Sequence, residues 1–340
     1  MKVFIKAVSY YLPKAFETNA DIIKDFPDWS EKKISKIGIS KRYISGAQTA
    51  GDMAECAANR LLEEYSIDRS TIDALILCTQ SPDYFLPTTA CILQDKLHFS
   101  KNILAFDYNL GHSGYVYGLG IAKGLITAGI AKNILLLTSE TYQKYIHPKD
   151  RGNRALFSDA AAATLISTNG FAEIEEFEFG TDGSGYKNLI VESGAHRMRK
   201  NQGIELNPEN GVERSPDYLY MDGPEIFNFS LNSVPLLVSQ VLLKNNLKLN
   251  EIDLFVFHQP NKLLMNFIRD AIGIPEEKFY ICLEEYGNTV SSTIPIALYN
   301  AKRDGIIHPS TNVMIAGFGV GYSWGGVNLR IKDYATKNEL

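Results

Sequence analysis

Short runs of apolar residues recur along the chain and predict buried strands. The clearest are ALILC (74–78), ILLLT (134–138), LFVF (254–257) and VMIAG (313–317). Continuous apolar runs of this length are typical of strands covered on both faces. Segments with helical apolar spacing alternate with them, at 50–65, 114–129, 225–245 and 262–272. This alternation predicts βαβ units, largely parallel strands and right-handed crossovers.

A weak internal repeat relates the two parts of the chain. STIDALILCTQSPD (70–83) matches NEIDLFVFHQPNKL (250–263), and AKNILLLTSE (131–140) matches STNVMIAGFG (310–319). Both offsets are close to 180 residues, so the repeat predicts two similar α/β halves. We place them at 1–170 and 171–340.

One polar segment interrupts the second half. Residues 196–218 (HRMRKNQGIELNPENGVERSPDY) are rich in charged and turn-forming side chains. They predict a surface excursion, and a lid or ligand-contacting loop is the alternative, because long loops are often functional.

Composition excludes several classes of protein. The chain has 340 residues, 45% of them hydrophobic, and a formal net charge of −5, so a large core is expected and a nucleic-acid partner is not. Its four cysteines form no CxxC pair, which fits a reducing cytoplasm. The N-terminal MKVFIKAVSYYLP lacks the features of a signal peptide and predicts a strand. No stretch of 18 uninterrupted apolar residues occurs, so no membrane span is expected.

Four motifs, in order, carry a family resemblance. They are AFDYNLGHSGYVYGL (105–119), DRGNRALFSDAAAATLI (150–166), FHQPN (257–261) with YGNTVSS (286–292), and GFGVGYSWGG (317–326). With them the chain resembles the β-ketoacyl-ACP synthase III family of the thiolase superfamily. The resemblance implies an α/β fold, a five-layered αβαβα sandwich of two pseudo-symmetric halves. It also implies a homodimer; a heterodimer with a homologue is the alternative.

In that family a cysteine at a helix N-terminus takes an acyl group from CoA and passes it to malonyl-ACP, in fatty-acid or polyketide-type biosynthesis. The matching position here is His112. A helix N-terminus disfavours an imidazolium by up to about 2 kcal/mol, so a neutral ring is expected. Such a ring can donate or accept hydrogen bonds or act as a base, but an acyl group bound to it is labile. The alternative is that His112 only fills the space that the cysteine side chain occupies in the family. The neighbouring Ser113 is expected to cap the helix.

Two further positions match the family's catalytic pair. His258 lies in HQPN and Asn288 in GNT, where both can hydrogen-bond a thioester carbonyl and stabilise an enolate. Gln259 and Asn261 are expected to fix the loop, and Asn261 also lies where substrate would pass. A metal site on His112 and His258 is disfavoured, since no third ligand is spaced to join them.

The remaining candidates concern the oxyanion hole and the substrate. The resemblance implies one backbone N–H donor at His112 and another at Val320, which lies in a turn between Gly319 and Gly321. The two glycines are also expected to contact the substrate or its pantetheine arm. Two other positions are implied to contact substrate: Arg151 at the CoA entrance and Leu86 reaching across a dimer interface. The family's adenine-stacking tryptophan is absent at Lys32, although Trp29 is near.

The sequence therefore predicts a cytoplasmic acyltransferase of the 3-oxoacyl-ACP synthase III type. It would act on CoA or phosphopantetheine thioesters, with acyl carrier protein or acyl-CoA as partner and no permanently bound cofactor. Because the cysteine is absent, the reaction is expected to be non-covalent. The alternatives are a malonyl-thioester decarboxylase and a silent subunit that binds an acyl carrier protein or a homologue.

Overall fold

The structure is a computed structural model that describes residues 1–200 and 215–332. Most of its strands join one mixed sheet in the order β11-β12-β13-β8-β1-β7-β6-β4-β5. These strands are β1 (Phe4–Tyr11), β4 (Ala74–Cys78), β5 (Leu104–Tyr108), β6 (Asn133–Glu140), β7 (Ala160–Ser167), β8 (Ala172–Thr181), β11 (Leu254–Phe257), β12 (Asn312–Gly319) and β13 (Ser323–Ile331). Short pairs are formed by β2 (Ala15–Thr18) with β3 (Lys41–Ile44), and by β9 (Leu189–Ile190) with β10 (Tyr220–Met221).

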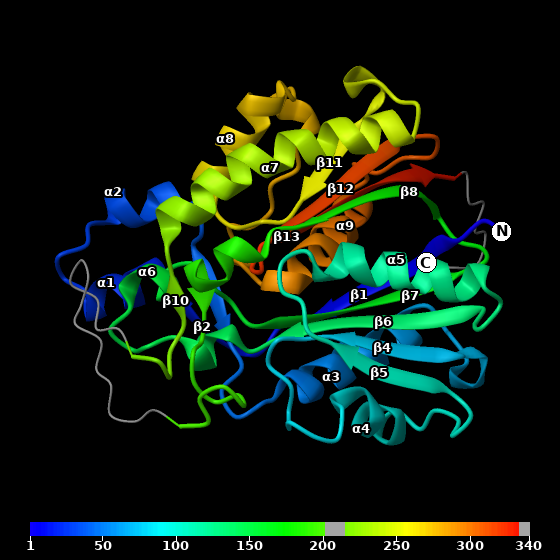
Figure 1. Ribbon diagram of the computed structural model, residues 1–340, viewed down its shortest axis with the longest axis horizontal. Coiled ribbons are helices and arrows are strands. Elements are labelled where there is room, and N and C mark those ends of the chain that lie inside the picture. Colours follow the sequence, from blue (N-terminus) through cyan, green and yellow to red (C-terminus); the bar gives the residue numbers. More distant parts are fainter. Residues whose placement is uncertain (201–214, 333–340) are drawn as a thin grey trace.

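The α-helices of the described residues are α1 (Asn19–Asp25), α2 (Glu31–Ile34), α3 (Ala50–Glu64), α4 (Thr89–Lys96), α5 (Gly114–Thr127), α6 (Arg151–Arg154), α7 (Gly223–Lys244), α8 (Lys262–Ile272) and α9 (Thr293–Arg303). All but α1, α2 and α6 cover or separate the two halves of the sheet (Figure 1). Figure 1 shows α7 and α8 above one half, α5 and α9 between the halves, and α3 and α4 below the other. The predicted five-layered sandwich is confirmed.

The repeated segments occupy equivalent places in the two halves. Strands β4 and β11 come from one repeat pair, and β6 and β12 from the other. In each half these two strands run parallel to each other. The halves are joined edge to edge, since Phe4 and Ile5 of β1 pair with Glu173 and Ala172 of β8. The division at residue 170 falls just before this seam, and as a domain boundary it stays a prediction.

The central layer is packed closely enough to exclude side chains at Gly114 and Gly118 of α5. A Cβ atom on Gly118 would lie 2.3 Å from the Tyr108 hydroxyl and 2.7 Å from Leu136 Cδ1. Tyr115, in the same helix, is completely buried. These contacts set α5 deep between the sheet halves, with its N-terminus toward the residues that follow β5.

Helix α7 bears on the expectation that no segment spans a membrane. By length and composition alone it could cross a bilayer. One face of it packs against β8, β12, β13 and α8, as in a helix that covers a sheet, and 33% of its apolar window is buried. The expected absence of a membrane span stays a prediction.

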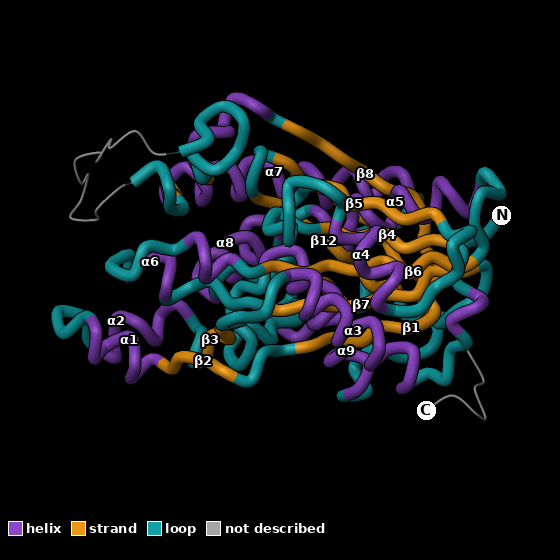
Figure 2. Tube along the Cα trace, turned by 90° about the horizontal axis from the view of Figure 1, so that it is seen from below, coloured by secondary structure: helices purple, strands orange, loops and turns teal. Residues whose placement is uncertain are grey.

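One end of the molecule is built from small elements. Figures 1 and 2 place α1, α2, α6, β2 and β3 together there. Of the predicted excursion at 196–218, residues 201–214 lie outside the described residues. The described residues before it, Ser193 to Ala195, border a cavity discussed below.

Candidate active site

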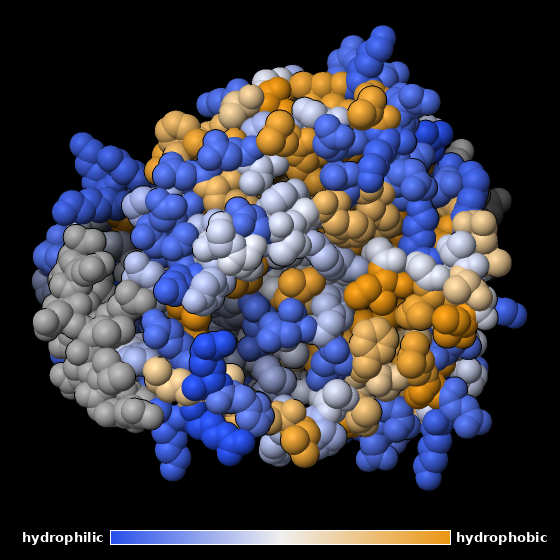
Figure 3. All heavy atoms as spheres, in the orientation of Figure 1, coloured by the Kyte–Doolittle hydropathy of each residue, from blue (hydrophilic) through white to orange (hydrophobic). Residues whose placement is uncertain are grey.

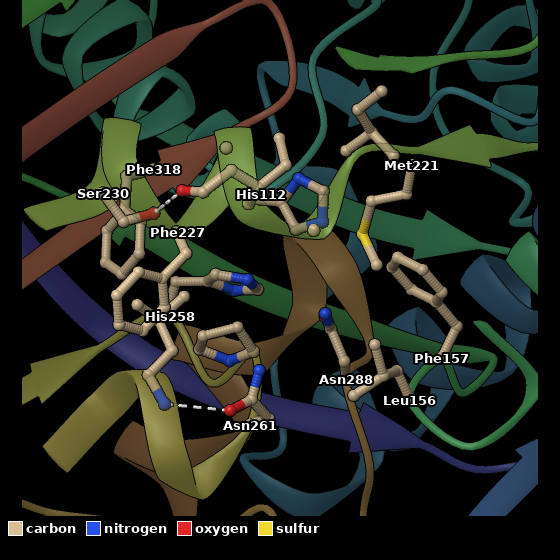
Figure 4. A pocket seen from close by; sticks show the side chains of 16 residues that line it. His112, Leu156, Phe157, Met221, Phe227, Ser230, His258, Asn261, Asn288 and Phe318 are labelled. Atoms are coloured by element: carbon tan, nitrogen blue, oxygen red, sulfur yellow. Dashed lines mark hydrogen bonds between the residues drawn. The ribbon is translucent and has the colours of Figure 1, made fainter. Parts of the chain in front are cut away.

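A cavity of about 170 Å³ collects most of the residues that the sequence singled out. Five of the nine site residues that the sequence predicts line it: His112, Asn261, His258, Asn288 and Gly319. The rest of its wall is mainly apolar, with Leu156, Phe157, Leu189, Met221, Ile226, Phe227, Leu264 and Phe318. Figure 4 shows the polar side chains converging from separate elements. With so apolar a wall, water competes little for hydrogen bonds between these polar side chains and a ligand.

His112 lies between β5 and α5 and is buried. The backbone N–H of Val320 donates to its Nδ1 over 3.4 Å. A neutral ring that accepts at Nδ1 carries its proton on Nε2. The approach requires Gly319, because a Cβ there would lie 2.5 Å from Nδ1.

Burial lowers the pKa of His112 to about 4. The ring is therefore neutral at pH 7, as expected, but the cause is loss of hydration rather than the helix dipole. The expected cap by Ser113 is wrong. Its side chain makes no capping bond, and its hydroxyl lies 2.7 Å from that of Ser323.

His258 follows β11 and faces His112 edge to face, with ring centroids 4.7 Å apart. Its Nδ1 lies 2.8 Å from the hydroxyl of Thr293. Burial, and secondarily the neighbouring His112, hold the pKa of His258 well below its usual range. Two neutral imidazoles thus share one cavity.

Asn288 is held so that its amide nitrogen faces the cavity. Its Oδ1 accepts a 3.0 Å hydrogen bond from the backbone N–H of Val290, which fixes the orientation of the amide. Figure 4 shows the nitrogen directed inward. Val290 has φ of +55°, an uncommon conformation for a β-branched residue. The turn is thus strained while it positions this donor.

The HQPN loop is fixed by its own side chains. Asn261 is the N-cap of α8, and its Oδ1 accepts from the backbone N–H of Leu264 at 2.9 Å. Gln259 donates to the carbonyls of Phe257 and Tyr280 and accepts from Cys282 N–H. The expected loop-fixing roles are confirmed, and Asn261 also lines the cavity.

Val320 does not line this cavity. Its side chain borders a second one of about 760 Å³, together with Gln80, Tyr142 and Tyr145. Leu189 lines both cavities, so only a thin wall separates them. Gly321 has φ of +138° in the same turn but lines neither cavity.

Two predicted substrate contacts lie elsewhere. Arg151 forms an ion pair with Asp28, and its guanidinium lies 5.7 Å from the ring centre of Trp29. Leu86 is 82% exposed and lines neither cavity, whereas Tyr84 and Phe85 border the larger one. Among residues 1–200 and 215–332, no group of three or more His, Cys, Asp and Glu side chains is placed to hold a metal ion.

Sequence reasoning missed the apolar wall and Thr293. Met221 and Phe227 come from β10 and α7, far along the chain from the motifs. Leu156 and Phe157 do lie in a recognised motif, but nothing in their spacing marks them as facing a cavity. Thr293 directly follows the YGNTVSS segment, and a hydroxyl so placed was the available signal.

Comparison with known proteins assigns the family. A family model described as 3-oxoacyl-[acyl-carrier-protein] synthase III matches residues 106–183, and the C-terminal model of the same enzyme matches 242–331. A β-ketoacyl-[acyl-carrier-protein] synthase III of Clostridium perfringens is 36% identical over 94% of this chain and 97% of its own length. The chain belongs to the 3-oxoacyl-ACP synthase III family. Family members are acyl-transferring condensing enzymes.

Solved structures of synthase III proteins share the fold over nearly the whole chain. A crystal structure of a 3-oxoacyl-(acyl-carrier-protein) synthase III has 42% identity and a TM-score of 0.94, covering 97% of this chain and all of that one. A 3-oxoacyl-(acyl-carrier protein) synthase of Burkholderia xenovorans has 36% identity and a TM-score of 0.88, covering 98% and 95%. The two family-model matches include His112 in the first and His258 and Asn288 in the second.

The buried imidazoles make the stability of this synthase III relative depend on pH. A pKa of about 4 for His112, against 6.5 in an unfolded chain, corresponds to about 3 kcal/mol of unfolding free energy. Because the folded pKa is depressed, this contribution is present above pH 6.5 and is lost as the pH falls toward 4. Urea unfolding at stepped pH should show the decline, and His112→Gln should make it less steep, because the buried His258 still contributes.

The exposed His308 provides the control for this pH series. His308→Ala should follow the wild-type curve. A His112→Gln curve parallel to wild type would show that His112 is not the depressed group.

Proposed function

We propose that this chain is a synthase III-like acyltransferase that acts on acyl thioesters of CoA or acyl carrier protein without forming an acyl-enzyme. In this proposal His112 stands where the family keeps its cysteine nucleophile. The observation that carries it is the convergence of His112, His258 and Asn288 on one apolar cavity. Phosphopantetheine thioesters would be substrates, and no permanently bound cofactor is required.

The chemistry assigned to the site is polarisation of a thioester carbonyl. The Asn288 amide and a ring N–H of His258 would donate to the carbonyl oxygen of a malonyl thioester. When the bond to CO₂ breaks, its electron pair enters the enolate, and the same two donors stabilise the negative oxygen. The apolar wall strengthens both hydrogen bonds by excluding water.

His112 is assigned a hydrogen-bonding role in this reaction. A pKa near 4 makes the ring a weak proton acceptor at neutral pH, which argues against a general base. Its Nε2–H is left as a donor, because Nδ1 accepts from Val320. An acyl-imidazole, if formed, would be labile, so a stored intermediate is not expected.

Decarboxylation without condensation is the second candidate. It is favoured by the hydrogen bond from Val320 N–H to His112 Nδ1, which occupies a predicted oxyanion-hole donor. An acyl carbonyl would have to displace the ring to use that donor. Decarboxylation needs only the donors of His258 and Asn288, which that hydrogen bond leaves unoccupied.

An exposed apolar surface supports the proposed dimer. Tyr84, Phe85 and Leu86 form a consecutive run that is at least 63% exposed. Figure 3 shows further apolar side chains on the face that carries α5 and β5. Exposed apolar side chains of this kind are frequent at protein interfaces. Acyl carrier protein or acyl-CoA would deliver the substrate.

Intact-mass measurement after incubation with acyl-CoA or acyl-ACP tests the central claim. We expect no stable acyl adduct on the wild-type protein, while malonyl-ACP is consumed in a parallel assay. A stable adduct would overturn the non-covalent proposal. Release of CO₂ without a condensed product would select decarboxylation, and no turnover with any donor would indicate a silent subunit.

A further inference from the structure

We infer that Gln80 is a specificity-determining residue, which selects a donor thioester whose acyl group carries a hydroxyl. The inference rests on the proposed function, in which an acyl thioester occupies the site, and it concerns the larger cavity. That cavity has a volume of about 760 Å³, and the polar side chains of Gln80, Asn109 and Tyr142 lie in its wall. A purely apolar chain would leave these groups without a partner in the ligand.

The Gln80 amide lies beside the residue that precedes His112. A Cβ atom on Gly111 would lie 2.5 Å from Gln80 Oε1 and 2.6 Å from Val320 Cγ1. The wall between the two cavities is thin, since Leu189 lines both. An acyl chain that passes from His112 into the larger cavity therefore runs next to the Gln80 amide. A hydroxyl held there belongs near the thioester end of the chain.

Four neighbours hold Gln80 in place. Its Oε1 accepts from the Tyr142 hydroxyl, and its Nε2 donates to Asn109 Oδ1 over 3.0 Å. Its backbone carbonyl accepts from the Tyr145 hydroxyl at 2.8 Å, and its backbone N–H donates to the Glu140 carboxylate at 3.1 Å. Only one of the two Nε2 protons is used in this way. The other is a donor in a fixed orientation, ready for a ligand.

The groups left for a ligand are one donor and one acceptor. Gln80 keeps an N–H, and the Tyr142 oxygen keeps its lone pairs, because its own proton goes to Gln80 Oε1. A hydroxyl can accept from the first group and donate to the second. A keto group can only accept, and an ammonium group can only donate. A hydroxyl is therefore the smallest substituent that satisfies both.

The charge around the cavity disfavours an anionic acyl group. Among the described residues that border this cavity there is no Lys, Arg or His, whereas Asp83 contributes a carboxylate. That carboxylate is held at the start of α3, where it accepts from Gly51 N–H at 2.9 Å and from the Thr49 hydroxyl at 3.0 Å. A carboxylate on the acyl chain would find no opposite charge, and burying it unpaired is costly. The selected group is thus neutral as well as polar.

Binding of two matched thioesters tests the inference. Butanoyl-pantetheine and 3-hydroxybutanoyl-pantetheine differ by one hydroxyl and carry the arm that CoA and acyl carrier protein share. We expect wild type to bind the hydroxylated thioester about 10-fold more tightly, because the other leaves the Gln80 N–H and the Tyr142 oxygen unpaired. Calorimetry measures both Kd values. Equal values, or tighter binding of the butanoyl thioester, would overturn the inference.

Two variants assign the effect to Gln80. Gln80→Met keeps the length of the side chain and removes the amide, so the two Kd values should come within about 3-fold of each other. Gln48→Met is the matched control, because Gln48 also exchanges hydrogen bonds with a tyrosine hydroxyl, that of Tyr11, but lines neither cavity. It should keep the wild-type ratio. A wild-type ratio in Gln80→Met would contradict the role of Gln80.

The remaining outcomes separate folding and function from specificity. If Gln80→Met does not fold, Asn109→Ala at an exposed position releases the same amide and should lower the ratio of Kd values. An unchanged ratio in that variant would count against the inference. If wild type binds both thioesters equally, the proposed function stands and the role of Gln80 fails. If wild type binds neither thioester, both fail.

Discussion

His258→Ala should lower the rate of malonyl-thioester decarboxylation by about 100-fold to 10,000-fold, the usual effect of removing a positioned acid–base or hydrogen-bonding group. The imidazole is one of two donors assigned to the developing enolate, and it lies in a largely apolar cavity. Alanine leaves a space that is open to the cavity, so a water molecule there would be a poorly oriented replacement. Release of ¹⁴CO₂ from labelled malonyl-ACP measures the effect.

Two variants make this result interpretable. His308→Ala removes an exposed imidazole that lines neither cavity and should keep the wild-type rate. Asn288→Ala removes the other proposed donor and should cause a comparable loss. If the two losses multiply in the double variant, the groups act independently. A His258→Ala enzyme with full activity would contradict the assigned chemistry.

The fold could be predicted largely because its signals are local. The apolar runs at 74–78 and 254–257 form β4 and β11 with the expected bounds. The helix expected at 114–129 runs from Gly114 to Thr127. The spacing of apolar residues and the residue types within a short segment determine such strands and helices. The seam between β1 and β8 has no comparable signal, because pairing of distant strands depends on the packing of the whole chain.

The same distinction between local and long-range signals applies to the site residues. His258 and Asn288 could be placed from their motifs, and the structure brings them to one cavity with His112. Arg151 is different, because a charged surface side chain takes the partner that the fold supplies, here Asp28. The hydrogen bond from Val320 to His112 could not be foreseen from residues 208 positions apart. It depends on a turn whose glycine lets the imidazole approach.

His112→Cys should convert the protein into one that retains an acyl group. A cysteine at 112 would sit two residues before the first residue of α5, where the helix N-terminus favours a thiolate. Removing the imidazole also frees the N–H of Val320 for an acyl carbonyl oxygen. After incubation with acyl-CoA, intact mass should increase by one acyl group in this variant and not in wild type.

The native thiols define the control for that experiment. Burial raises the pKa of Cys78, Cys282 and Cys56, so these thiols are poor nucleophiles. Cys91 is exposed, so the comparison is made in a Cys91→Ser background. An adduct that vanishes with Cys91→Ser, or that wild type also forms, would contradict acylation at 112.

The same variant also discriminates between the two proposed reactions. In the first case, His112 occupies the place of the acyl group, and malonyl thioester is decarboxylated without condensation. His112→Cys should then release CO₂ more slowly in the absence of an acyl donor. When acyl-CoA is added, CO₂ and condensed product should appear together. In the second case, wild type is an acyltransferase that does not bind the acyl donor covalently. Its decarboxylation should then already depend on acyl-CoA. His112→Cys should change only how long the acyl group stays on the protein. Measuring CO₂ and product together, with and without acyl-CoA, assigns His112 either to replacing a bound acyl group or to orienting a free one.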